Sequence, residues 1–295
     1  MSAALPGYGP IPYMERALSG EPPSPEALAH ALKVWDASAR ALWALQLPYE
    51  ERPGKPLSGS RRHNCARYVA ARLAGLEEAH DAGPRRQGNY LKGRIVEAVA
   101  RCQAILGGLP SVLSPSPDDG EEVSYTYRLG GDEYTDRPDL VWREGGALVV
   151  ADFKGGNQWA VNELRDGEPP PTKFDQAGQV FRHMRAVEDH YAEPVARGYY
   201  VVIDAATFQY AQAVQPWSVE AWDDMERTYI AGSSSVSSPF SIPRPSWATT
   251  KFVAGCEEIT SPACSYCGYR ARCWPGFDLV VLSKGPVWRK PNTEK

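Results

Sequence analysis

Two acids and a lysine lie close together in the stretch TDRPDLVWREGGALVVADFKGG, residues 135–156. We expect two short strands joined by a Gly-Gly turn, with Asp139 in the first strand and Asp152 and Lys154 in the second. Side chains two positions apart on a strand point to the same face, so Asp152 and Lys154 should lie side by side. Carboxylates on adjacent strands can converge on one hard cation such as Mg²⁺, which prefers oxygen ligands. A lysine beside the cation can orient or deprotonate a water, or neutralise charge that builds on a phosphate.

The alternative for this stretch is a hairpin whose charged residues simply face solvent. Residues 147–151, Ala-Leu-Val-Val-Ala, are apolar at consecutive positions, which is typical of a strand covered on both faces. Burying Asp152 and Lys154 at the end of such a strand without partners would cost on the order of several kcal/mol. We therefore expect these two residues to bind a metal or to pair with other groups in a cleft.

A helix expected over residues 89–106 carries an acid ahead of the hairpin. Glu97 follows Gly93 by four positions and has apolar neighbours, and Gly107-Gly108 would end the helix. Taken alone, Glu97 would be an exposed acid on a helix surface. The hairpin downstream favours a third carboxylate for the same site.

A second helix is expected after the hairpin, in the segment KFDQAGQVFRHMRAVEDHY, which follows a Pro-rich loop. Gln176, Gln179 and His183 fall on one face of this helix, at positions i, i+3 and i+7. A polar helix face that only meets solvent explains each of these residues equally well.

The pattern Pro138-Asp139, twelve residues, then Asp152-Phe153-Lys154 resembles the core of the PD-(D/E)xK nucleases. The resemblance implies that these two acids and the carbonyl of Phe153 bind Mg or Mn, and that Lys154 activates a water.

The same resemblance extends to both helices. In these nucleases a helix ahead of the catalytic strands supplies a Glu or His after such a glycine, which here is Glu97, a further metal ligand. A Gln on the following helix holds the site or the phosphate, a role that Gln176 or Gln179 matches. The cluster-bearing CRISPR-associated branch often has His at the position of Glu97, and this departure leaves the preferred metal open.

The six cysteines include the spaced group Cys264-x2-Cys267-x5-Cys273. Soft thiolates at this spacing select zinc or an iron-sulfur cluster, whereas a disulfide framework is not expected in a cytoplasmic protein of this size. The fourth ligand is either Cys256, which is nearest in sequence, or Cys65, on a helix expected over residues 57–75 with Ser60 as its cap.

RecB-like nucleases with an iron-sulfur cluster, among them CRISPR-associated and AddB-type members, resemble this arrangement: one Cys ahead of the core and three after it. Cys65 lies 32 residues ahead of Glu97. The resemblance implies a structural 4Fe-4S cluster whose binding contributes to folding, with Cys102 and Cys256 left as free thiols. The implied ligands are Cys65, Cys264, Cys267 and Cys273.

The charge distribution bears on the substrate. The chain has 32 basic and 36 acidic residues, a net charge of −4, which by itself does not favour a nucleic-acid-binding protein. Locally, residues 61–101 hold nine Lys or Arg against four acids, and residues 118–144 hold nine acids against three Arg. An acidic floor beside an arginine-rich wall is what a metal-dependent phosphodiesterase needs, and exposed Trp or Tyr can stack on unpaired bases.

Length and hydropathy set the architecture. With 295 residues, 43% of them hydrophobic, the chain can bury a sizeable core. Its first residues lack the features of a secretory signal and no apolar run approaches ~18 residues, so we expect a cytoplasmic protein with no membrane partner.

The expected fold is α/β, with a mixed central sheet flanked by helices as in a restriction-endonuclease-like core, plus an iron-sulfur-cluster cap formed by both ends of the chain. The expected segments are an N-terminal extension with a helix over residues 1–56, a nuclease core over residues 57–231, and a Ser/Pro-rich linker and cysteine segment over residues 232–295.

The resemblance implies a metal-dependent DNA nuclease, an exonuclease that acts on single strands or duplex ends in recombination, repair or phage replication. It also implies an annealing protein or helicase as partner, since the chain has no G-x4-G-K-[ST] phosphate loop of its own. The alternatives are a non-catalytic DNA-binding or assembly module and a zinc-bearing structure-specific endonuclease. The presence of all three acids together with Lys154 favours the nuclease.

Overall fold

The computed structural model describes residues 9–44, 65–76, 84–165, 174–246, 248–261, 264, 267–282 and 285–291. Contacts divide the chain into two compact units, here called unit 1 (Met1–Glu51 and Ala82–Val219) and unit 2 (Arg52–Asp81 and Glu220–Lys295). The described residues 9–44 fall in unit 1 and the described residues 65–76 fall in unit 2, while the predicted segment bounds stay a prediction. Among the helices described, none is long and apolar enough to span a membrane.

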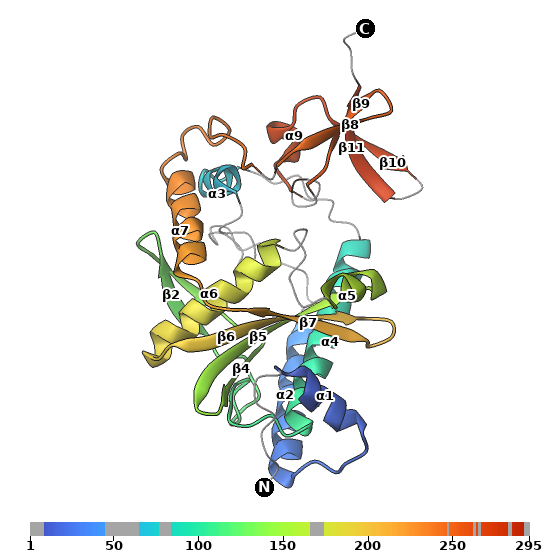
Figure 1. The fold of residues 1–295 in the computed structure, drawn as a ribbon, viewed down its shortest axis with the longest axis vertical. Coiled ribbons are helices and arrows are strands. Elements are labelled where there is room, and N and C mark those ends of the chain that lie inside the picture. The colour runs from blue at the N-terminus through green and yellow to red at the C-terminus, as the bar shows by residue number, and fades with distance from the viewer. Residues whose placement is uncertain are drawn as a thin grey trace. The chain divides into compact units, whose positions relative to one another are not determined.

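Unit 1 is built on a five-stranded sheet with the order β1-β4-β5-β6-β7 (Figure 1). The pair β5 and β6 is parallel and the other neighbours are antiparallel, which confirms the predicted mixed sheet. The strands are β1 (Val112–Ser114), β4 (Leu140–Glu144), β5 (Ala147–Gly156), β6 (Val195–Asp204) and β7 (Tyr210–Gln215).

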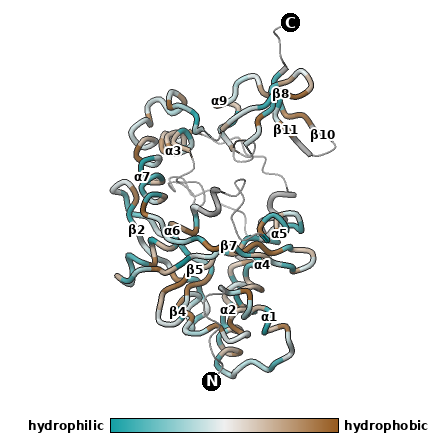
Figure 2. The backbone as a smooth tube through the Cα atoms, in the orientation of Figure 1, coloured by the Kyte–Doolittle hydropathy of each residue, from teal (hydrophilic) through white to brown (hydrophobic). Residues whose placement is uncertain are grey.

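Helices flank this sheet, as predicted. The helix α4 (Pro84–Leu106) packs on β5, and α1 (Ile11–Leu18) and α2 (Pro25–Ala44) pack on α4. Val96 of α4 shares a buried cluster with Phe153 of β5 and Tyr199 of β6. Figure 2 shows hydrophobic residues around the labels of β4 and β7. The opposite face is covered by α6 (Phe174–Tyr191), since a Cβ on Gly198 would meet Val180 and Met184.

The predicted hairpin around residues 135–156 is present. The strands β4 and β5 pair antiparallel from Leu140 opposite Ala151 to Glu144 opposite Ala147, with a Gly145-Gly146 turn. Asp139, expected inside the first strand, instead precedes β4. The ladder begins at Leu140 because the Asp139 side chain accepts a hydrogen bond from the backbone of Phe153.

Unit 1 also contains a second hairpin that the sequence reading did not predict. It consists of β2 (Tyr125–Leu129) and β3 (Asp132–Asp136), with alternating buried and exposed positions along β2. Both strands contact α6, so this two-stranded sheet covers α6 as a separate layer.

Unit 2 brings α3 (Ala66–Leu73) against α7 (Val219–Ser233). A Cβ on Gly232 would lie 2.6 Å from the Cβ of Val69, so only glycine permits this close approach. The start predicted for the first of these helices is wrong. Cys65 is extended, with φ −154° and ψ 119°, and is itself the N-cap, so Ser60 does not cap α3; residues 45–64 lie outside the described part.

The C-terminal part of unit 2 contains a four-stranded sheet, order β10-β11-β9-β8, which was also not predicted. Across it, Glu258 pairs with Lys251 at 3.3 Å and with Arg289 at 2.7 Å. A short helix, α9 (Arg270–Cys273), precedes β10. The strands are β8 (Thr250–Val253), β9 (Cys256–Ile259), β10 (Asp278–Leu282) and β11 (Gly285–Pro291).

Candidate active site and cysteine group

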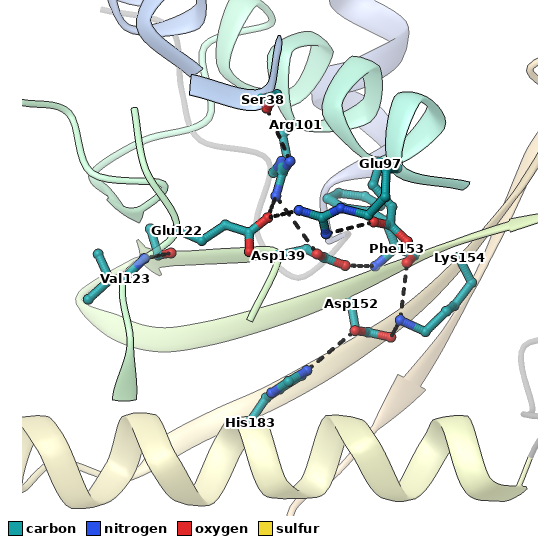
Figure 3. Close-up of polar contacts among 12 residues, drawn as sticks. Ser38, Glu97, Arg101, Glu122, Val123, Asp139, Asp152, Phe153, Lys154 and His183 are labelled. Atoms are coloured by element: carbon teal, nitrogen blue, oxygen red, sulfur yellow. Dashed lines mark hydrogen bonds and ion pairs between the residues drawn. The ribbon is translucent and has the colours of Figure 1, made fainter. Parts of the chain in front are cut away.

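Asp152 and Lys154 lie on one face of β5 and contact each other, as their spacing predicts. The Nζ atom of Lys154 is 2.5 Å from Oδ2 of Asp152 and donates to the carbonyl of Phe153 at 3.3 Å (Figure 3). Asp152 is 1% exposed, whereas the Lys154 side chain retains 21% of its exposure. The pair therefore stands at the edge of the core, where the acid is buried and the lysine side chain is partly exposed.

Asp139 is held against the same strand from the segment ahead of β4. Its Oδ2 accepts a hydrogen bond of 2.7 Å from the backbone N–H of Phe153, and the residue is 5% exposed. A backbone donor that points at a buried carboxylate fixes its orientation. Asp139 is thus fixed next to the strand that carries Asp152.

The third predicted acid, Glu97, comes from α4, which approaches β5 closely. A Cβ on Gly155 would lie 3.1 Å from the Cα of Gly93, so two glycines allow the helix and the strand to meet just ahead of Glu97. Arg94 links Glu97 to Glu122, with Nη1 3.1 Å from Oε2 of Glu97 and Nη2 3.1 Å from Oε1 of Glu122.

A buried arginine, Arg101, completes this network and was not among the predicted site residues. It is 2% exposed, pairs closely with Glu122, and has Nη1 3.8 Å from Oδ1 of Asp139 and Nη2 3.3 Å from Oγ of Ser38 (Figure 3). The sequence did contain a signal for Arg101, because the spacing of Arg94, Glu97 and Arg101 places all three on one helical face. Nothing in the sequence marked Glu122.

These positions change the prediction of an arginine-rich wall. Arg101 is buried and Arg94 is engaged by two carboxylates, so neither belongs to an exposed phosphate-tracking surface. Arg61 and Arg62, which the prediction also included, lie outside the described residues.

Burial and mutual repulsion shift the pKa values of the acids. Burial, with Asp139 nearby, raises the pKa of Glu97 to about 8, and burial with Asp152 nearby raises the pKa of Asp139. Burial opposes ionisation of Asp152, but Lys154 and His183 outweigh it and lower its pKa. Burial would lower the pKa of Lys154, but the three carboxylates outweigh it and raise it. The site holds four carboxylates, from Glu97, Glu122, Asp139 and Asp152, and three cations, from Lys154, Arg94 and Arg101. This excess of acids favours binding of a further cation.

The predicted convergence of the acids on one metal ion stays a prediction. Within the described residues, no three His, Cys, Asp or Glu side chains already stand in positions that could hold a metal ion. Two of the predicted ligands have other partners instead. Oδ2 of Asp139 accepts a hydrogen bond from the Phe153 N–H, and the Lys154 ammonium lies against Asp152.

The helix α6 contributes His183 to the site, a residue that the sequence reading placed beside Gln176 and Gln179 without giving it a role. Nε2 of His183 lies 3.3 Å from Oδ1 of Asp152 (Figure 3). The same nitrogen lies 3.3 Å from Nε2 of Gln179. Gln179 therefore reaches the acids only through His183 in the described contacts. The side chain of Gln176 lies outside the described residues.

Replacing Arg101 with methionine should destabilise the protein by about 3–5 kcal/mol, because it leaves Glu122 and Asp139 without their buried cation. Urea unfolding of the purified variant measures the change. Arg143→Met, which breaks an exposed pair with Glu193, is the matched control and should cost far less. Equal losses in the two variants would contradict the importance of the buried network.

Unit 2 brings together cysteines from its two sequence segments. Burial raises the pKa of Cys65 to about 11, and the nearby thiols of Cys273 and Cys264 add to this increase. The backbone N–H of Cys267 donates to the carbonyl of Cys264 at 3.1 Å, which forms a turn between them. All six cysteines are free of disulfides and half-buried, and Cys256 lies in β9 opposite Val253.

Two arginines accompany these cysteines. Arg67 hydrogen-bonds the thiol of Cys273, and Arg244 donates to the Cys273 carbonyl at 2.6 Å while stacking 3.8 Å above the ring of Trp274. Burial raises the pKa of Cys273, and the two arginines oppose that increase and so favour the thiolate form that binds metals. The name cysteine group is used below for Cys65, Cys264, Cys267 and Cys273.

No family model and no curated protein sequence matches this chain. Among solved structures, the chain is similar to SSO0001, with 14% identity and a TM-score of 0.39, over 81% of this chain and 95% of that chain. It is also similar to LHK-Exo in complex with dAMP, with 16% identity and a TM-score of 0.36, over 70% of this chain and 90% of that chain.

Proposed function

We propose that the chain is a metal-dependent DNA nuclease, an exonuclease that hydrolyses phosphodiester bonds. The observation that carries this proposal is the meeting of three acids and one lysine from separate elements of unit 1 in one partly buried, electrostatically coupled site. The proposed active-site residues are Glu97, Asp139, Asp152 and Lys154.

The donor set fits a hard divalent cation. Burial and a neighbouring carboxylate raise the pKa of both Glu97 and Asp139; the neighbour is Asp139 for Glu97 and Asp152 for Asp139. A divalent cation would relieve this repulsion between carboxylates. With the carbonyl of Phe153, the acids offer the oxygen ligands that Mg²⁺ or Mn²⁺ prefers. When bound, such a cation would polarise the scissile phosphate and lower the pKa of a water.

Lys154 is assigned to charge stabilisation. Because the neighbouring carboxylates raise its pKa, its side chain is a cation at neutral pH in this environment. It would therefore orient the attacking water and neutralise charge that develops on the phosphate, in preference to accepting a proton. Its side chain keeps an exposure of 21%, so Lys154 lies at the border between the core and solvent.

We further propose that the cysteine group holds a structural 4Fe-4S cluster. Three of its thiols, from Cys65, Cys264 and Cys273, are near enough to affect one another's ionisation, and Cys267 is joined to Cys264 by a turn. Four thiolates are the usual ligands of such a cluster, which would supply binding free energy to the folding of unit 2.

The proposed activity can be tested with end-labelled linear DNA and closed circular DNA, each incubated with Mg²⁺, Mn²⁺ or EDTA. We expect linear DNA to be degraded with either metal, circular DNA to be spared, and EDTA to stop the reaction. Binding of DNA without cleavage under every metal condition would instead favour the non-catalytic module. Recombination or repair as the setting, with an annealing protein or helicase as partner, stays a prediction from the resemblance.

A further inference from the structure

The imidazole of His183 lies between two carboxylates, one inside the proposed active site and one outside it. Its Nε2 is 3.3 Å from Oδ1 of Asp152, and its Nδ1 is 3.6 Å from Oδ2 of Asp136, the last residue of β3. The His183 side chain is 2% exposed, so both contacts are shielded from water. A buried ring that meets an acid on each side has a restricted orientation.

His183 and Lys154 divide the two oxygens of Asp152 between them. Lys154 approaches Oδ2 at 2.5 Å, while His183 approaches Oδ1. The Lys154 side chain is long and partly exposed, whereas His183 is buried on α6 with the buried residues Val180 and Met184 in the same helical turn. If Oδ2 of Asp152 bound a cation instead of Lys154, the contact of His183 with Oδ1 would still fix the rotation of the Asp152 carboxylate.

Asp136 is in turn held from α6. Nε of Arg182, a residue that is 0% exposed, lies 3.7 Å from the same Oδ2 that faces His183. The end of β3 thus receives two basic side chains from consecutive residues of one helix. The β2–β3 hairpin, which takes no part in the central sheet, is connected through Asp136 and His183 to Asp152.

We infer that His183 is a positioning residue for Asp152, and that Asp136 holds His183 in place. Groups outside a metal's own ligands commonly orient those ligands, and their loss costs about 10–100-fold in affinity or activity. The inference rests on the proposed function, because Asp152 is taken as a metal ligand. It gives the β2–β3 hairpin a role in the chemistry, which the central sheet alone would not require.

The test compares His183→Leu, His183→Gln and Asp136→Asn with the full-length protein. We expect His183→Leu to weaken Mn²⁺ binding without DNA, measured by isothermal titration calorimetry, by about tenfold, and to lower kcat by about 10–100-fold with little change in KM for DNA. His183→Gln keeps an amide donor and should restore part of both values. Asp136→Asn should shift them in the same direction by a smaller factor.

The matched control is His190→Leu, which alters an exposed histidine on the same helix, packed on the ring of Tyr125 at 5.1 Å. It should leave Mn²⁺ affinity and kcat unchanged. If His183→Leu does not fold, Asp136→Asn tests the positioning role instead, because Asp136 contacts the other nitrogen of the His183 ring. Wild-type Mn²⁺ affinity and kcat in the folded His183 and Asp136 variants would overturn the positioning role.

Failure of this inference differs from failure of the proposed function. If the wild-type chain binds no Mn²⁺ and cuts no DNA, the nuclease assignment is wrong, and the positioning role of His183 is wrong as well. If the wild-type chain is active and the His183 variants match it, only the positioning role is wrong.

Discussion

Lys154→Ala should lower the rate of DNA hydrolysis by about a hundredfold or more, the scale of one lost electrostatic or acid-base group at a reacting centre. Three carboxylates raise the pKa of Lys154, whose side chain lies partly exposed at the edge of the core. Its removal leaves the acids in place but takes away the positive charge that would face the phosphate. Single-turnover rates on end-labelled linear DNA, with Mg²⁺ and with Mn²⁺, measure the effect.

The matched control is Lys33→Ala, on α2, where Nζ donates to the carbonyl of Pro117 at 3.0 Å on the surface of unit 1. This variant should hydrolyse DNA at the wild-type rate. Circular dichroism and urea unfolding verify that both variants are folded, because loss of Lys154 also removes a partner of Asp152. A folded Lys154→Ala protein with wild-type activity would show that the active-site assignment is wrong.

The features predicted correctly from sequence are those that depend on residues close together in the chain. The two-residue spacing of Asp152 and Lys154 is a property of any strand, and the apolar run before them predicted burial on both faces. These inferences needed no knowledge of distant residues. The mixed central sheet, by contrast, was expected with the nuclease-like core, and the parallel pair of β5 and β6 confirms it.

The contacts that were missed are tertiary. His183 was visible on the polar face of α6, but its position between Asp152 and Asp136 depends on the packing of an unpredicted hairpin against that helix. Glu122 lies in a segment outside helices and strands, and only the folded chain shows that it accepts two arginines. In the same way, Cys65 is extended and α3 begins after it, although the sequence predicted a helix that starts at Ser60.

Cys267→Ser should remove most of the iron from the purified protein and most of the soluble, folded chain. The cysteine group draws on both sequence segments of unit 2, so a bound cluster would join Cys65 to the C-terminal segment and its binding free energy would become folding free energy. Structural zinc in zinc-finger peptides contributes about 10–16 kcal/mol, which is comparable to or larger than the net stability of a domain. Iron, sulfide and zinc analysis of anaerobically purified protein, with visible absorbance, measures the loss.

Cys256→Ser is the matched control, because Cys256 lies in β9 opposite Val253 and is the alternative fourth ligand. If the cluster is held by Cys65, this variant should keep the wild-type iron content and yield, whereas Cys65→Ser should behave like Cys267→Ser. Zinc in place of iron, lost on Cys256→Ser and kept on Cys65→Ser, would replace the cluster with a local zinc site. The acids and Lys154 are in unit 1, so any Cys267→Ser protein that folds should keep its DNA hydrolysis rate per folded molecule. A folded, iron-free variant that had lost hydrolysis would mean that the cluster takes part in the chemistry and is more than a structural element.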